Sequence, residues 1–302
     1  MIKIGIIGLG DIAQKAYLPV ISKKKVEVHL CTRNENTLRM VGEQYRFQNL
    51  HQNIDSLINS GITGAFVHSA TASHDEIVEQ LLNNNIHVYI DKPVTYEYPS
   101  TEKLLELAAR KNLILTVGFN RRFAPAYQIT KELANPNIIM MQKNRKSLPG
   151  DVRTFIFDDF IHVIDTLLYL FPYPVQKMLV NGMKRGDKLY QVVVQLIAAD
   201  GATAIGIMNR DSGTTEEKLE VFTSVGKQVV YNVSEVVICE DKHEKKLGLN
   251  EWAPTLFKRG FEQIVDDFLL ALASGNEPKI KKQEILRTHK VCEEIVEELN
   301  KL

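Results

Sequence analysis

The chain has 302 residues, of which 44% are hydrophobic and 25% are charged, and 37 lysines and arginines balance 37 aspartates and glutamates. This length predicts two globular domains. The balanced charge argues against a nucleic-acid partner, and the lack of an apolar run of about 18 residues argues against a membrane span. The three cysteines are scattered and lack metal-ligand spacing, which predicts reduced thiols. The N-terminus shows no signal-peptide pattern and no preceding targeting segment, so a cytoplasmic location is expected.

The chain opens with a β-branched run over residues 2–7 that passes through the letters GLGDIA of residues 8–13 into a helical pattern. Strand, tight turn and helix with G-x-G-x-x-A spacing are the arrangement in which a dinucleotide-binding fold holds a pyrophosphate. Gly8 would permit the turn, Gly10 would let the backbone approach the anion, and Ala13 would let the helix pack on the strand. A plain turn fits the same letters. The residues assigned to the cofactor here are Gly8, Gly10, Asp11 and Ile12.

Strand-like and helix-like runs alternate up to about residue 119. The strand-like runs are residues 2–7, 26–31, 64–69, 88–90 and 114–117, and the helix-like runs include 75–82 and 100–109. This alternation predicts a parallel sheet covered on both faces, which is a Rossmann domain over residues 1–119. Ser100 is expected to cap the second of these helices.

The pattern changes over residues 120–302, where we expect an α+β domain for substrate binding and oligomerisation. Its runs are a strand over 140–146, an apolar helix over 156–170, hairpins 189–199/202–209 and 219–224/228–233, and helices 257–273 and 284–299. Asp200-Gly201 and Val225-Gly226-Lys227 are the hairpin turns. The alternation predicts a mostly antiparallel open sheet with helices on one face, the C-terminal helix being free to pack back on the first domain. The other face, apolar at 192–194 and 205–208, is expected to form a homodimer or homotetramer.

The end of the second strand bears on the choice of cofactor. NAD-binding folds usually place an acidic residue there, whereas this chain has Thr32 followed by Arg33. A hydroxyl and a guanidinium would bind a 2′-phosphate, so NADP is predicted over NAD. Alternatively, Arg33 is a solvated loop residue or stacks on the adenine without discriminating between the two cofactors.

The segment SATASH, residues 69–74, follows another strand at the carboxyl edge of the sheet. Its small residues would let the backbone approach a dinucleotide, and Ser69, Thr71 and His74 are therefore assigned to the cofactor. Ser73 is equally well explained as an ordinary helix cap.

The motif VYIDKP, residues 88–93, ends an apolar strand with a lysine before a proline. Together with GFNRRF (118–123) and DDFIHVID (158–165), it resembles the Gfo/Idh/MocA dehydrogenases, and the wording is closest to their MviM-like branch. The resemblance implies reversible hydride transfer with a nicotinamide cofactor, catalysis by Lys92, Asp158 and His162 together, cofactor contacts from Asp91 and Lys92, and dimers or tetramers. Two departures are Asp91 in place of glutamate and Phe160 in place of glycine, so sugar specificity is not carried over.

The helix over residues 156–170 can also be interpreted without the family resemblance. Asp158 and His162 are four residues apart and share a helix face, and Asp165 can reach it. Its other residues are mostly apolar, so the helix is expected to be buried and its polar groups to need partners. Either these groups satisfy one another, or His162 acts as a general base while Lys92 stabilises an alkoxide and Asp158 orients the histidine.

The remaining assignments concern the substrate. Asn120, Arg122 and Asp159 are predicted to contact it. Arg121 and Arg122 could bind an anionic group of the substrate or the cofactor, and an interdomain salt bridge is an equal alternative for both. The histidines are scattered without ligand spacing, so no metal is expected. A competing hypothesis is a non-catalytic nucleotide-binding protein that retains the fold. A methyltransferase fits least, since the second strand lacks the acidic ribose contact.

Overall fold

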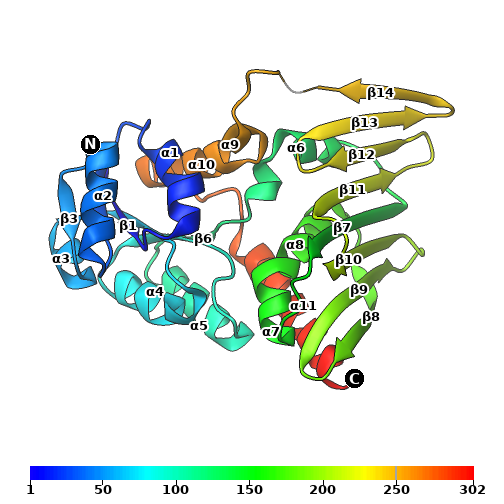
Figure 1. The fold of residues 1–302 in the computed structure, drawn as a ribbon, viewed down its shortest axis with the longest axis horizontal. Helices are drawn as coiled ribbons and strands as arrows, with labels where there is room; N and C mark the ends of the chain where they lie inside the picture. The colour runs from blue at the N-terminus through cyan, green and yellow to red at the C-terminus, as the bar shows by residue number, and fades with distance from the viewer. Residues whose placement is uncertain (249) are drawn as a thin grey trace. The chain divides into compact units, whose positions relative to one another are not determined.

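A computed structural model describes residues 1–248 and 250–302. The chain divides into two compact units, each with its own sheet (Figure 1). The first consists of residues 1–118 and 261–287, and the second of residues 119–260 and 288–302. A segment from the C-terminal part of the chain therefore completes the N-terminal unit.

The first unit is built on a parallel sheet in the order β3-β2-β1-β4-β5-β6, which confirms the predicted Rossmann-type fold. Its strands are β1 Lys3–Ile7, β2 Glu27–Cys31, β3 Asn49–His51, β4 Gly64–Val67, β5 His87–Ile90 and β6 Leu115–Val117. Ile7 is in register with Cys31 and Val67, and Val67 with Ile90. The carboxyl ends of β1, β2, β4 and β5 therefore lie along one edge of the sheet.

Helices cover this sheet as the alternation predicted. They are α1 Leu18–Ile21, α2 Glu35–Tyr45, α3 Ile54–Asn59, α4 His74–Asn83, α5 Tyr98–Arg110 and α10 Phe261–Ser274. The cap expected at Ser100 is wrong, because α5 begins two residues earlier and has Pro99 in its first turn. Ser73 makes no capping bond either: its hydroxyl donates to the Ala70 carbonyl at 2.8 Å. The aromatic ring of Phe268 on α10 packs on Phe66 of β4.

The second unit is built on an eight-stranded sheet in the order β14-β13-β12-β11-β7-β10-β9-β8. Its strands are β7 Ile138–Lys146, β8 Val175–Arg185, β9 Lys188–Ala198, β10 Thr203–Ser212, β11 Glu216–Phe222, β12 Lys227–Tyr231, β13 Glu235–Glu240 and β14 His243–Leu247. Both predicted hairpins, β9–β10 and β11–β12, are confirmed. The sheet is mostly antiparallel, but β7 runs parallel to β10.

Two of the three helices predicted in this half of the chain are interrupted. The first consists of α7 Val152–Phe155, the π-helical segment η4 Ile156–Phe160 and α8 Ile161–Leu170. The second breaks at Gly260, between α9 Thr255–Lys258 and α10. Gly260 has a φ of 82°, and a Cβ there would lie 2.2 Å from the Asn120 carbonyl oxygen, so this close approach requires glycine.

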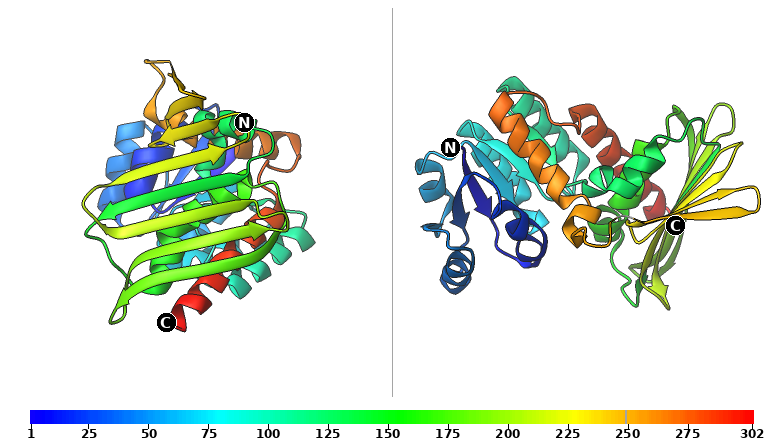
Figure 2. Two further views of the ribbon diagram at one scale, coloured as in Figure 1. Left: turned by 90° about the vertical axis from the view of Figure 1, so that its right-hand side faces the viewer. Right: turned by 90° about the horizontal axis from the view of Figure 1, so that it is seen from above.

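Helices cover one face of the eight-stranded sheet, and the opposite face is open in the part of the chain that the structure describes (Figure 2, left). On the covered face α8 approaches β10, where a Cβ on Gly206 would lie 3.0 Å from Val163 and 3.1 Å from Leu167. Burial alternates along β9 and β10, so Val193, Ile205 and Ile207 are only half-buried while their neighbours are buried. The last helix, α11 Lys282–Asn300, follows α10.

Candidate active site

The glycine turn after β1 fits a dinucleotide. Gly8 has a φ of 84°, and a Cβ on it would lie 2.6 Å from the Ser69 backbone nitrogen, so no larger residue fits. A Cβ on Gly10 would meet nothing within 4 Å. The turn is thus closely packed on its inner side at Gly8 and has open space at Gly10, where a pyrophosphate would approach the backbone. Asp11 and Ile12 are exposed, and Asp11 pairs with Lys15 at 2.7 Å.

The end of β2 lies beside this turn. The Gly8 N–H donates to the Cys31 carbonyl at 3.0 Å, which places Thr32 and Arg33 next to the glycine turn. The Thr32 N–H donates to the His51 carbonyl at 3.2 Å. Arg33 is exposed, and its guanidinium has no hydrogen bond or ion pair with any residue that the structure describes. It is therefore available to an anionic group.

His74 connects the loop after β4 to the segment that carries Lys92. His74 is 1% exposed, with ring Nε2 3.0 Å from the Ser69 carbonyl and Nδ1 3.0 Å from the Pro93 carbonyl. Burial lowers the pKa of His74, although both carbonyl contacts favour the protonated ring. The structure thus gives both ring nitrogens of His74 protein partners. Thr71 lies in the short 3₁₀ turn Thr71–Ser73 that leads into α4.

Lys92 follows β5 at the same sheet edge, and its peptide bond to Pro93 is cis. The Asp91 carboxylate accepts a hydrogen bond from the Lys92 backbone N–H at 2.9 Å. A Cβ on Gly118 would lie 3.2 Å from this carboxylate and 2.9 Å from the Tyr17 hydroxyl. Most of the predicted cofactor residues are therefore brought together along one edge of the first sheet.

In the second unit the predicted helix residues lie on two kinds of helix. Asp158 and Asp159 belong to the π-helical η4, whereas His162 belongs to α8 and is 9% exposed. A π-helix closes its hydrogen bonds over five residues instead of four. The i, i+4 spacing of Asp158 and His162 therefore does not by itself define a shared face here. Asp158 is half-buried.

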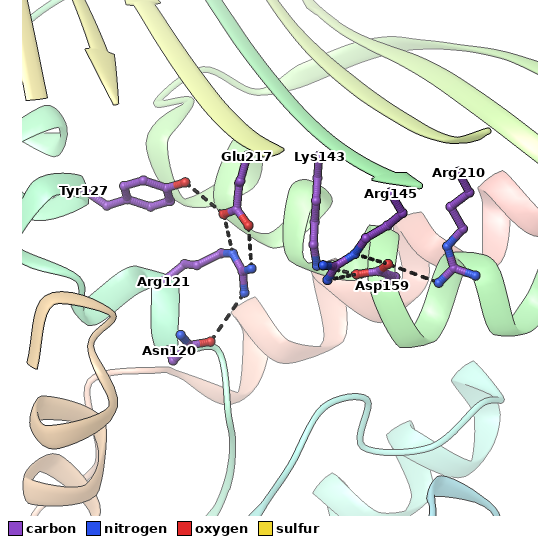
Figure 3. A network of polar contacts seen from close by, with 8 residues as sticks. All are labelled: Asn120, Arg121, Tyr127, Lys143, Arg145, Asp159, Arg210 and Glu217. Atoms are coloured by element: carbon purple, nitrogen blue, oxygen red, sulfur yellow. Dashed lines mark hydrogen bonds and ion pairs between the residues drawn. The ribbon is translucent and has the colours of Figure 1, made fainter. Parts of the chain in front are cut away.

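Asp159, predicted to contact the substrate, is surrounded by protein cations (Figure 3). Its carboxylate accepts hydrogen bonds from Lys143, from Arg145 Nε at 3.2 Å and from Arg210 Nη2 at 3.1 Å. Despite burial, which acts in the opposite direction, Lys143 and Arg145 hold the pKa of Asp159 well below its usual range. Burial, reinforced by the Arg121 guanidinium, lowers the pKa of Lys143 to about 7. Sequence reasoning missed all three cations, whose only signal is their place in alternating strands.

The two adjacent arginines form buried ion pairs within the second unit. Arg121 donates through Nε and Nη2 to the Glu217 carboxylate, both at 2.7 Å, and the Tyr127 hydroxyl donates to the same group at 3.0 Å. Arg122 pairs with Asp165 at 2.8 Å. The pairs are thus internal to this unit, unlike the interdomain bridge considered above. Asn120 Nδ2 donates to the Arg259 carbonyl at 2.8 Å, which fixes the chain ahead of Gly260.

Among residues 1–248 and 250–302, no group of three or more histidine, cysteine, aspartate or glutamate side chains is placed to bind a metal ion. Within the same residues, no helix has both the length and the apolar character that a membrane crossing requires.

Known proteins match both units. The profile of the Gfo/Idh/MocA oxidoreductase family, with an NAD-binding Rossmann fold, matches residues 2–119, and that of the YceM-like C-terminal domain matches residues 125–244. YceM of Salmonella typhimurium is 33% identical over 97% of this chain and 96% of its own. The crystal structure of a dehydrogenase (MviM) from Clostridium difficile is 32% identical, with a TM-score of 0.94 over 98% of this chain and 99% of that one. Myo-inositol 2-dehydrogenase of Thermotoga maritima is 23% identical over 93% of this chain and 91% of its own.

Proposed function

Because the chain belongs to the Gfo/Idh/MocA oxidoreductase family, whose Rossmann domain binds a nicotinamide cofactor, we propose that it transfers hydride reversibly between NADP and a secondary hydroxyl of a sugar, polyol or related small molecule. The observation that carries the proposal is the glycine turn, tightly packed at Gly8 and open at Gly10. The likeness to a myo-inositol 2-dehydrogenase over nearly the whole chain supports a hydroxyl-bearing substrate.

Three side chains would do the chemistry. His162 takes the proton of the substrate hydroxyl as a general base. Lys92 donates a hydrogen bond to the same oxygen and stabilises the negative charge that develops on it. Asp158 orients His162 or binds a substrate hydroxyl. A nicotinamide, when bound, would supply the carbon that accepts the hydride as the alcohol becomes a carbonyl.

The first unit supports a positioning role for the residues around Lys92. The backbone on either side of that lysine is fixed by Asp91, which accepts from the Lys92 N–H, and by the Pro93 carbonyl, which contacts His74. A lysine whose backbone is fixed in this way loses less freedom when it binds the reacting oxygen. Asn120 and Arg122 remain proposed substrate contacts beside their structural ones.

The preference for NADP rests on Arg33, an exposed guanidinium next to the glycine turn with no partner among the described residues. A 2′-phosphate would give it a charge-assisted hydrogen bond. We expect Arg33→Ala to weaken the binding of NADPH at least about tenfold, which is the scale of one such bond, and to leave the binding of NADH unchanged. Arg110→Ala, an exposed arginine on α5, is the matched control. Equal losses for both cofactors, or tighter NADH binding by the wild type, would refute the preference.

Turnover is tested with a panel of sugars, inositols and sugar phosphates, followed by the absorbance of the reduced nicotinamide. Lys92→Ala should lower turnover at least about 100-fold, the scale of one acid–base or electrostatic group. The control is Lys103→Ala, an exposed lysine paired with Glu79 at 3.0 Å. Wild-type rates in Lys92→Ala would remove Lys92 from the mechanism. Cofactor binding without turnover of any substrate would favour the non-catalytic alternative.

We also propose a cytoplasmic homodimer or homotetramer formed through the open face of the second sheet. The support is the row of half-buried apolar side chains on that face, which includes Val193, Ile205 and Ile207. Light scattering at micromolar concentration should report a multiple of the 34.3 kDa chain mass. A monomer would contradict this assembly.

A further inference from the structure

Positive charge exceeds negative charge in the polar network of the second unit (Figure 3). Its two buried carboxylates, Asp159 and Glu217, are shared among several cations. Those cations are Arg121, Arg145 and Arg210, which stay charged, and Lys143, whose pKa burial lowers to about 7. Buried charges are normally balanced, because an uncompensated one costs several kcal/mol. The excess therefore requires an explanation beyond internal ion pairing.

A fifth cation, Arg259, adds to this excess. It is half-buried, and its side chain has no hydrogen bond or ion pair with the residues that the structure describes. Burial and the neighbouring Arg121 and Arg145 guanidiniums lower its pKa, while Glu217 opposes them. Its backbone is held by Asn120 at 2.8 Å. A guanidinium has five N–H donors, so a fixed, partly desolvated arginine without an acceptor is prepared to receive one.

Two further arginines in the cluster have unused donors. Arg145 is 36% exposed and donates through Nε and Nη2 to Asp159, and its Nη1 has no acceptor within the described part of the chain. Arg210 is buried, and its Nε has no hydrogen-bond partner among the described residues. Asp159 thus satisfies only part of the donor capacity around it. A group with several acceptor oxygens would satisfy more of it.

We propose that Arg145 and Arg259 bind an anionic oxygen group of the substrate, a carboxylate or a phosphate. Guanidiniums suit such groups because they donate two parallel hydrogen bonds to adjacent oxygens. The cluster is also tied to the proposed base, since Asp159 lies three residues before His162 on the same interrupted helix. The substrate of the hydride transfer is then an acidic hydroxy compound, such as a sugar acid or a sugar phosphate. Only its description as a substrate rests on the proposed function.

The test is calorimetric titration of the whole chain, with and without saturating NADPH. The probes are inorganic phosphate, glucose 6-phosphate, gluconate and, as a neutral control, glucose. The three anions should bind more tightly than glucose, and the affinities of the two sugar derivatives show whether phosphate or carboxylate is preferred. Arg259→Gln and Arg145→Gln should each weaken the binding of the preferred anion at least about tenfold, which is about 1.4 kcal/mol. Arg185→Gln, an exposed arginine of the same sheet, should not.

Thermal unfolding without added anion separates a binding role from a structural one. Arg259→Gln removes repulsion from two neighbouring guanidiniums, so its midpoint should equal or exceed that of the wild type. A lowered midpoint would show that Arg259 supports the fold and would overturn the proposal. The proposal also fails if the anions bind no better than glucose, if both glutamine variants bind like wild type, or if NADPH abolishes anion binding.

The proposed oxidoreductase function can fail separately. Arginine-dependent anion binding without turnover of any hydroxy compound would retain the anion site and refute the hydride transfer. Turnover of neutral polyols that is unaffected in Arg259→Gln and Arg145→Gln would retain the hydride transfer and refute the anion site.

Discussion

His68 is a buried histidine that the fold keeps neutral. It follows β4, is 5% exposed and stacks on the Tyr17 ring with centroids 4.0 Å apart. Both ring nitrogens are buried without a hydrogen-bond partner in the described part of the chain. Burial, with a smaller contribution from His74, lowers its pKa from 6.5 to about 3. The folded state therefore resists a proton that the unfolded chain accepts readily.

This difference makes stability depend on pH with a defined sign. The folded pKa is depressed, so the stabilisation is present above pH 6.5 and is lost as the pH falls toward about 3. The loss is about 1.4 kcal/mol per pH unit within that window, or about 2.5 kcal/mol between about pH 7 and about pH 4.5. Glu217 contributes little in this range. Burial of Glu217 would raise its pKa, but the Arg121 guanidinium lowers the pKa of Glu217 from 4.5 to about 2. The stabilisation from Glu217 is therefore lost only at lower pH.

The assay is urea unfolding of the wild type and His68→Phe at these two pH values. Phenylalanine keeps the stacking and removes both unpaired nitrogens, so the variant should be more stable at neutral pH by about 1–3 kcal/mol. It should also lose about 2.5 kcal/mol less than the wild type on acidification. His243→Gln, at an exposed position on β14, should follow the wild type. Parallel pH profiles for wild type and His68→Phe would refute the reasoning.

Two other substitutions test the second unit and its boundary. Asp159→Asn leaves three cations without their carboxylate and should lower the free energy of unfolding by about 3–5 kcal/mol in urea, with exposed Asp187→Asn as the control. Gly260→Ala combines a φ of 82° with a Cβ 2.2 Å from the Asn120 carbonyl and should lower the melting temperature far more than Gly275→Ala. Gly275 has a φ of 72° and open space, so only about 1–2 kcal/mol of backbone strain applies there. Equal melting temperatures would contradict the clash.

Local patterns sufficed to predict most of both sheets. Strands β1 and β4 are buried on both faces and show continuous apolar runs, and β9 and β10 alternate around an obvious turn at Asp200-Gly201. The missed strands are β3, β8, β13 and β14. β3 has only three residues, β14 is nearly all exposed and no residue of β8 is fully buried, so these three lack the pattern that burial imposes. β13 does carry a signal, an apolar run in which Val236 and Val237 are buried.

The helix interruptions differ in how far they could be anticipated. Residues 156–170 are apolar apart from a few polar positions such as Asp158, Asp159, His162 and Asp165, and nothing in their spacing distinguishes a π-helical turn from an α-helical one. The break between α9 and α10 did have a signal, Gly260, which the hydrophobic pattern over 257–273 concealed. A glycine within a helical pattern should first be interpreted as the left-handed residue that ends a helix, and only then as a tolerated residue in the helix interior.

The charged network shows the limit of sequence reasoning most clearly. Asp159 could be nominated from its place in a motif, but its partners lie on β7 and β10, whose parallel pairing no local pattern predicts. Net charge is equally uninformative at this scale. The chain has as many acidic as basic residues, yet the structure gathers five cations around two carboxylates in one unit. Overall neutrality argues against long polyanions such as nucleic acids, whose binding depends on an extended positive surface. It places no restriction on one small anion held by two guanidiniums.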